Sequence, residues 1–110
     1  MIREIGPEEL ASRLASGAPT RLVDVRQEWE HEIAALPGSE LLPLDALAYG
    51  DETLEPRGGE ELVVVYCHHG VRSLTGVALI QRQGWTGEIV SLAGGIDAWS
   101  LRVDPSVPRY

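Results

Sequence analysis

The apolar residues of the chain are concentrated in short runs that alternate with segments of helical spacing. Residues 62–66 are all apolar or aromatic, which is typical of a strand buried on both faces. From Ser73 the apolar positions recur at helical spacing, and Gly84 ends the pattern. A strand, a loop and a helix are therefore predicted in succession. Similar but shorter runs predict four further strands, at residues 1–5, 21–26, 40–42 and 89–92.

Helices are predicted between most of these strands. Pro7 suits the first helical position and acidic residues follow it, so a helix is expected from there to about Gly17. Shorter helices or turns are predicted at residues 28–36, 43–49 and 96–101, with a surface connection at 50–61 and an extended tail at 105–108. This alternation predicts an α/β fold: one three-layer α/β/α domain, residues 1–110, with a mostly parallel five-stranded sheet.

The only cysteine, Cys67, directly follows the most strongly predicted strand. It should lie at the carboxyl end of that strand and face a helix N-terminus, where open α/β sheets bind ligands. Backbone N–H groups of a tight loop containing Gly70 would stabilise a thiolate there. Arg72 adds positive charge and a planar fork suited to an oxyanion or to a nearby carboxylate. The alternative is a buried, unreactive cysteine at a strand end.

The segment from Cys67 to Ser73 resembles the active-site loop of the rhodanese-like sulfurtransferases. Five loop residues after the cysteine, ending in Arg72, match that family, whereas the related dual-specificity phosphatases have one more residue before the arginine. The resemblance implies that Cys67 becomes a transient persulfide, with Arg72 as its catalytic partner and with no metal or organic cofactor. The remaining loop residues would bind the substrate: His68, His69, Gly70, Val71 and Ser73.

Two other segments extend the resemblance over nearly the whole chain. Residues 22–39 are similar to the family's first signature, and residues 92–99 are similar to its closing signature. The first signature departs from the family pattern, because Ala34 and Ala35 replace the usual Gly-His pair. This replacement concerns the bracing of that turn and leaves the cysteine loop intact.

Asp24 and Arg26 are expected on the same rim as Cys67, because they end a neighbouring strand. In a supporting role, Asp24 would anchor the loop backbone or Arg72, and Arg26 would add positive potential. The alternative is a surface ion pair of little energetic value. Glu28 and Glu30 are expected on a solvated face or as charges at a helix N-terminus.

His68 and His69 are the side chains nearest the nucleophile in sequence. They could act as acid, base or cation toward a donor, or simply line the mouth of the loop, which we favour. A metal site formed with Cys67 is disfavoured, because adjacent histidines rarely converge on one ion. His31 is expected to be distant and exposed.

Charge and composition limit the partners. A net charge of −8 argues against binding to nucleic acid or to an anionic membrane. The sequence has no apolar run of membrane-spanning length and no signal-peptide pattern, and a single cysteine suits a reducing compartment, so a cytoplasmic location is expected.

The resemblance implies a thiosulfate sulfurtransferase, which moves a sulfane sulfur from a small anionic donor to a thiol or protein acceptor. Two alternatives stay open. Residues 103–108 resemble tails of rhodanese domains fused to sulfur-carrier-activating enzymes, which suggests a carrier or docking module for cofactor biosynthesis or tRNA thiolation. A phosphatase or arsenate reductase on the same scaffold is disfavoured by the loop length.

Overall fold

The computed structural model describes residues 2–57 and 59–110. Met1 of the predicted first strand and Gly58 of the predicted connection lie outside the described residues. Within those residues the strands are β1 (Glu4–Ile5), β2 (Thr20–Asp24), β3 (Glu40–Leu41), β4 (Leu62–Tyr66) and β5 (Ile89–Leu92). The helices of the same residues are α1 (Pro7–Ala15), α2 (Glu28–Ile33), α3 (Leu44–Tyr49), α4 (Arg72–Arg82) and α5 (Gly95–Arg102).

The strands form one sheet in the order β1-β5-β4-β2-β3, and the pairs between described strands are parallel. β4 lies in the middle of the sheet, and all of its residues are buried. The prediction of a mostly parallel five-stranded sheet is therefore confirmed. The residue that follows β4, Cys67, emerges at the centre of the sheet's carboxyl edge.

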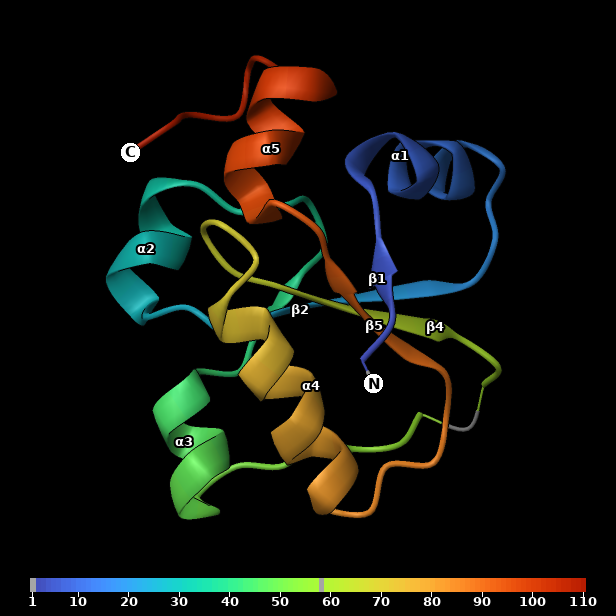
Figure 1. The fold of residues 1–110 in the computed structure, drawn as a ribbon, viewed down its shortest axis with the longest axis vertical. Coiled ribbons are helices and arrows are strands. Elements are labelled where there is room, and N and C mark those ends of the chain that lie inside the picture. Colours follow the sequence, from blue (N-terminus) through green and yellow to red (C-terminus); the bar gives the residue numbers. More distant parts are fainter. Residues whose placement is uncertain (1, 58) are drawn as a thin grey trace.

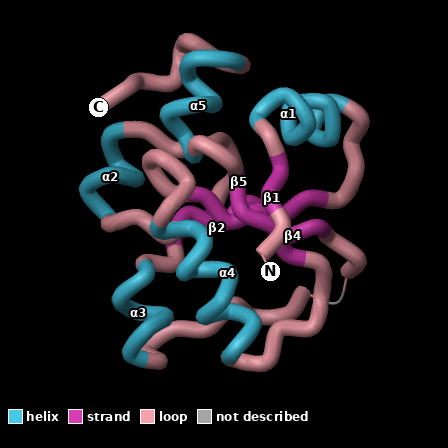
Figure 2. Tube along the Cα trace, in the orientation of Figure 1, coloured by secondary structure: helices cyan, strands magenta, loops and turns pink. Residues whose placement is uncertain are grey.

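Helices cover both faces of the sheet, as Figures 1 and 2 show, and the predicted three-layer arrangement is confirmed. On one face α1 and α5 pack over Leu62, Val64 and Tyr66 of β4. On the other face α3 and α4 pack over Val63 and Val65. Alternate residues of β4 thus enter the two cores, because successive side chains of a strand point to opposite faces.

Several predicted boundaries differ from the structure by a few residues, and two of the differences have a clear physical cause. β2 ends at Asp24, because the backbone N–H of Arg26 bonds the Asp24 carboxylate at 2.9 Å and no longer continues the sheet. The predicted extended tail instead turns at Asp104, whose carbonyl accepts the Val107 N–H at 3.1 Å. Val107 is then buried in the core beside α5, which directs Tyr110 back toward the carboxyl edge of the sheet.

The helices of the described residues are too short or too polar to cross a lipid bilayer.

Candidate active site

The sulfur of Cys67 lies inside the loop that joins β4 to α4. Two backbone N–H groups donate to Sγ, from Gly70 at 3.2 Å and from Ser73 at 3.3 Å. Ser73 belongs to the first turn of α4, so its N–H has no partner within the helix and is free to bind the sulfur. Cys67 is 1% exposed, and its sulfur is therefore held mainly by the backbone. This is the position at a helix N-terminus that the sequence predicts.

Gly70 allows the loop to close around the sulfur. Its φ of +92° is one that side chains disfavour, and a Cβ on this residue would lie 2.8 Å from the backbone nitrogen of Gly94. The cysteine loop therefore packs directly on the Gly94–Gly95 turn that begins α5. This contact gives the Gly94–Gly95 pair a structural role that the sequence alone does not reveal.

The first turn of α5 caps the cysteine loop. The N–H of Ile96 donates to the Cys67 carbonyl at 2.9 Å, and the N–H of Asp97 donates to the His68 carbonyl at 3.0 Å. A Cβ on Gly95 would lie 2.4 Å from the same Cys67 carbonyl, so a glycine is required there. With their carbonyls bonded outward to α5, the loop residues can direct N–H groups toward the sulfur.

A pair of buried serines supports the loop from the sheet. Ser73 Oγ lies 3.5 Å from Cys67 Sγ and 2.7 Å from the hydroxyl of Ser91 on β5. Both serines are fully buried. Ser91 was not expected from the sequence, because only the pairing of β4 with β5 brings it under the loop.

Arg72 is held by Glu30 through two parallel hydrogen bonds. Nη1 lies 2.7 Å from Oε1, and Nη2 lies 2.8 Å from Oε2. Glu30 lies in the first turn of α2, which agrees with the predicted helix N-terminal charge. It is 3% exposed, so the alternative of a solvated face is wrong. The Arg72 guanidinium lowers the pKa of the Glu30 carboxyl to about 2. Of the two partners predicted for Arg72, the structure contains the carboxylate.

Asp24 and Arg26 form a buried pair and do not reach Arg72. Arg26 Nη2 lies 2.8 Å from Asp24 Oδ2, and both side chains are completely buried. The Asp24 carboxylate bonds Arg26 and His31, and it makes no direct bond to Arg72 or to the backbone of the cysteine loop. The alternative of a surface ion pair is wrong, because the pair is buried. Arg26 also bonds the carbonyl of Ala34, which bends the chain after α2. The hydrogen bonds of the Arg26 guanidinium go to Asp24, Ala34 and Tyr110, and none of them goes to Cys67.

His31 braces the same turn. Its Nδ1 lies 2.8 Å from Asp24 Oδ2, and its side chain is 27% exposed. The prediction that His31 is exposed is therefore wrong. His31 gives the Asp24 carboxylate an imidazole partner in a chain that has Ala34 and Ala35 in place of the Gly-His pair.

The two loop histidines are stacked on one another at the mouth. Their ring centroids are 4.1 Å apart, and the ring of Tyr110 stacks on the other face of His68, also at 4.1 Å. Burial, together with the neighbouring His69, lowers the pKa of His68. The His68 ring is therefore neutral at physiological pH and is held between two other rings.

Among the residues that the structure describes, the two histidines and Asp97 form a group that could hold a metal ion. One ligand atom from each lies within 4.8 Å of the others. Asp97 is already engaged by Arg109, at 2.8 Å, and this contact lowers the pKa of its carboxyl. The group does not include Cys67, so any ion bound there would sit on the rim of the loop.

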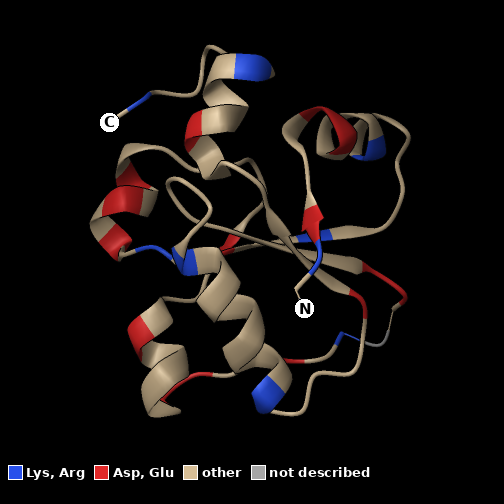
Figure 3. Cartoon of the chain, in the orientation of Figure 1, with Lys and Arg blue, Asp and Glu red and all other residues tan. Residues whose placement is uncertain are grey.

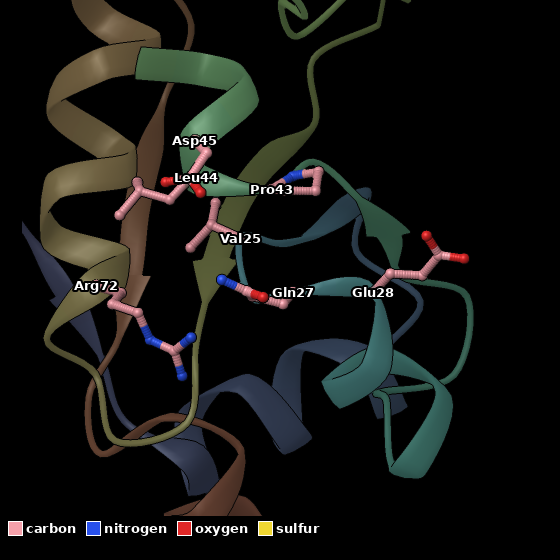
Figure 4. A pocket seen from close by; sticks show the side chains of 7 residues that line it. All are labelled: Val25, Gln27, Glu28, Pro43, Leu44, Asp45 and Arg72. Carbon is pink, nitrogen blue, oxygen red and sulfur yellow. The ribbon is translucent and has the colours of Figure 1, made fainter. Parts of the chain in front are cut away.

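A cavity of about 250 Å³ lies beside Arg72 (Figure 4). In Figure 4 the Gln27 amide lies between Arg72 and Glu28. The lining residues are Val25, Gln27, Glu28, Pro43, Leu44, Asp45 and Arg72. Figure 3 shows acidic residues on α2 and basic residues at the start of α4 and just before α2, so α2 itself adds no positive potential to the loop. Positive potential at the sulfur therefore comes from local N–H groups and from Arg72.

One family model covers both this fold and this cysteine loop. The family model described as Rhodanese-like domain matches residues 6–102. The chain therefore belongs to the rhodanese-like domain family.

Individual relatives agree with this assignment. A protein named sulfurtransferase from Allochromatium vinosum is 34% identical over 107 residues, covering 97% of this chain and 96% of that protein. The probable adenylyltransferase/sulfurtransferase MoeZ of Mycobacterium tuberculosis is 35% identical over 106 residues, covering 96% of this chain. The human single-domain sulfurtransferase TSTD1 has a TM-score of 0.76 and 27% identity, covering 93% of this chain and 98% of that one. The chain spans 20% to 38% of the length of its longer relatives.

Proposed function

We propose that this chain is a sulfurtransferase whose sulfur carrier is Cys67. The observation that carries the proposal is the pair of N–H donors, from Gly70 and Ser73, on the cysteine sulfur. Such donors stabilise negative charge on sulfur in a site from which water is largely excluded. A thiolate and a terminal persulfide anion carry the same charge, so one loop can stabilise both states. Membership of the rhodanese-like family supports the same reading.

In the first half-reaction the Cys67 thiolate attacks the outer sulfur of an anionic donor such as thiosulfate. A bond forms between Sγ and that sulfur, the sulfur–sulfur bond of thiosulfate breaks, and sulfite leaves with the electron pair. The product is a persulfide anion on Cys67. The step needs no oxidant, and neither a metal nor an organic cofactor takes part in the proposed reaction.

In the second half-reaction a thiophile attacks the outer sulfur of the persulfide. The acceptor is a small thiol or a protein cysteine, with cyanide as the laboratory substitute. The bond to the acceptor forms as the bond to Sγ breaks, and the Cys67 thiolate returns. We further propose that the reaction takes place in the cytoplasm, without nucleic acid or membrane as a partner, and that residues 1–110 act as one domain.

Arg72 is proposed to orient the anionic donor at the mouth of the loop. Its guanidinium stays charged but is paired with Glu30. Arg72 is therefore proposed to act through directional hydrogen bonds more than through an unpaired positive charge. His68, His69 and Val71 are proposed to shape the mouth, and the stacked histidines restrict the approach to the sulfur.

The proposal is tested by measuring the rate of sulfur transfer from thiosulfate to cyanide in wild type and in Cys67→Ser. The variant should be inactive, because a hydroxyl is far too weakly acidic to be the resting nucleophile. A phosphate ester assayed in parallel should give no cysteine-dependent product. Turnover that persists in folded Cys67→Ser would exclude the mechanism.

A second candidate function is a sulfur carrier that docks on a cofactor-biosynthesis or tRNA-thiolation enzyme. It is favoured by the likeness to MoeZ, whose name joins an adenylyltransferase and a sulfurtransferase. A carrier would accept sulfur from a cysteine persulfide on another protein and react slowly with thiosulfate. Loading rates measured with thiosulfate and with a protein persulfide donor separate the two candidates.

A further inference from the structure

We propose that Tyr110 is a positioning residue for Arg72 and acts on it through Glu30. The Tyr110 hydroxyl donates to Glu30 Oε2 at 2.7 Å. The same oxygen accepts from Arg72 Nη2 at 2.8 Å. One carboxylate oxygen therefore joins the tail of the chain to the arginine of the cysteine loop.

The four hydrogen bonds on Glu30 fix the direction in which Arg72 points. Arg72 supplies two of them, Tyr110 supplies one, and the backbone N–H of Gln27 supplies the fourth, at 3.1 Å to Oε1. A carboxylate offers about four such positions, so Glu30 is saturated. Removal of the Tyr110 hydroxyl leaves Oε2 with Arg72 alone. The carboxylate can then rotate, and the guanidinium, 38% exposed, is free to swing toward solvent.

Tyr110 itself is anchored on its other side. Arg26 Nη1 donates to the Tyr110 oxygen at 2.6 Å, and Arg26 is held in turn by Asp24. The hydroxyl thus accepts from a fixed arginine and donates to a fixed carboxylate. This orientation requires a protonated phenol, and burial together with Glu30 raises the pKa of Tyr110 to about 12. The contacts form a continuous chain from Asp24 to Arg72.

The ring of Tyr110 also contacts the loop directly. It lies 4.1 Å from the ring of His68, at an interplanar angle of 11°. The hydroxyl and the ring therefore serve different parts of the site, and Tyr110→Phe removes the first while keeping the second. Arg109 is the matched control on the same tail, because its ion pair with Asp97 lies outside the Glu30 contacts.

Alkylation of Cys67 tests the inference without a sulfur donor. Iodoacetate is an anion and is attracted by Arg72, whereas iodoacetamide is neutral. The rate with iodoacetate divided by the rate with iodoacetamide therefore reports the positive charge presented to the sulfur. The inference rests on the proposed role of Cys67 as the nucleophile. Because alkylation needs no sulfur transfer, failure to form a persulfide would contradict the proposed function alone, and the alkylation ratio would still decide the role of Tyr110.

The ratio should fall in Arg72→Ala. In Tyr110→Phe it should fall by about fivefold, since a change of this size is the usual effect of one hydrogen bond. It should stay unchanged in Arg109→Lys, which, like Tyr110→Phe, leaves the charge of the tail the same. In an Arg72→Ala or a Glu30→Gln background, Tyr110→Phe should have no further effect. An unchanged ratio in folded Tyr110→Phe would overturn the inference. So would an equal loss in the Arg72→Ala background, because a general structural role would act without Arg72.

Discussion

Glu30 and Arg72 are joined by two hydrogen bonds although 42 residues separate them in the sequence. Glu30 lies in the first turn of α2, the short helix after β2, and Arg72 is the first residue of α4. Their contact ties the two carboxyl-edge loops of neighbouring strands together. The pair is almost buried on the Glu30 side and partly open to solvent on the Arg72 side. It therefore affects both the stability of the fold and the site around Cys67.

Replacement of Glu30 by glutamine should destabilise the protein. Glutamine can accept from one group, but it cannot hold the guanidinium through two charged bonds. We expect a loss of about 1–3 kcal/mol in the free energy of unfolding, measured by urea titration at pH 7. Glu28 is exposed and lies two residues earlier in the same helix. Glu28→Gln is therefore the control and should change the stability little. Equal stability of the Glu30→Gln variant and wild type would show that the pair is energetically neutral.

The same pair predicts how stability depends on pH. The pKa of Glu30 is lowered from 4.5 to about 2 in the folded protein. A carboxyl with a lowered folded pKa stabilises the fold above its unfolded pKa and loses that contribution as the pH falls through the folded value. Wild type should therefore lose stability between pH 4.5 and about 2 more steeply than Glu30→Gln does. Urea titrations across this range measure it, and parallel curves for the two proteins would contradict it.

Gly70→Ala should disable the cysteine loop. Gly70 and Gly84 both have positive φ values, +92° and +105°, but a Cβ would meet the Gly94 backbone only at Gly70. Alanine at either place should cost about 1–2 kcal/mol of stability from its backbone conformation. At Gly70 the contact at 2.8 Å should add about 1–3 kcal/mol and displace the N–H that binds the sulfur. Thermal melts and turnover compare the two variants, and equal effects would argue against close packing of the loop on the Gly94–Gly95 turn.

His68 should contribute no titrating group to sulfur transfer at neutral pH. Its pKa is lowered from 6.5 by burial, so the ring is already neutral above that pH. The shape of the pH–rate profile between pH 6.5 and 8 should therefore be the same in wild type and in His68→Gln, although the absolute rate can change as the mouth widens. A limb of the profile that disappears in the variant would assign acid–base work to His68.

The local parts of this site are the parts that the sequence predicts. Cys67, Gly70 and Ser73 lie within seven residues of one another, and a strand–loop–helix pattern brings them together without information from elsewhere. The roles of Glu30 and Tyr110 are not predicted. Glu30 pairs with Arg72, 42 residues away, and Tyr110 bonds Glu30, 80 residues away. Neither hydrophobic periodicity nor charge encodes such contacts, which arise only when α2, α4 and the tail meet.

The supporting residues show the same limit. The alternating pattern predicts that Asp24 and Arg26 lie near the carboxyl edge of the sheet, and they do. It does not predict that the chain turns at Arg26 and buries the pair, since charged residues at a strand end are usually exposed. His31 is predicted to be exposed, but its imidazole bonds the buried Asp24 carboxylate, a contact that the local pattern does not encode.

The most direct test of the account is the intact mass of the protein after incubation with thiosulfate. Wild type should gain the mass of one sulfur atom, the gain should be reversed by a reducing thiol, and Cys67→Ser should gain nothing. A folded wild-type protein that stays unmodified by thiosulfate and by a protein persulfide would contradict the proposal that the Cys67 loop carries sulfur.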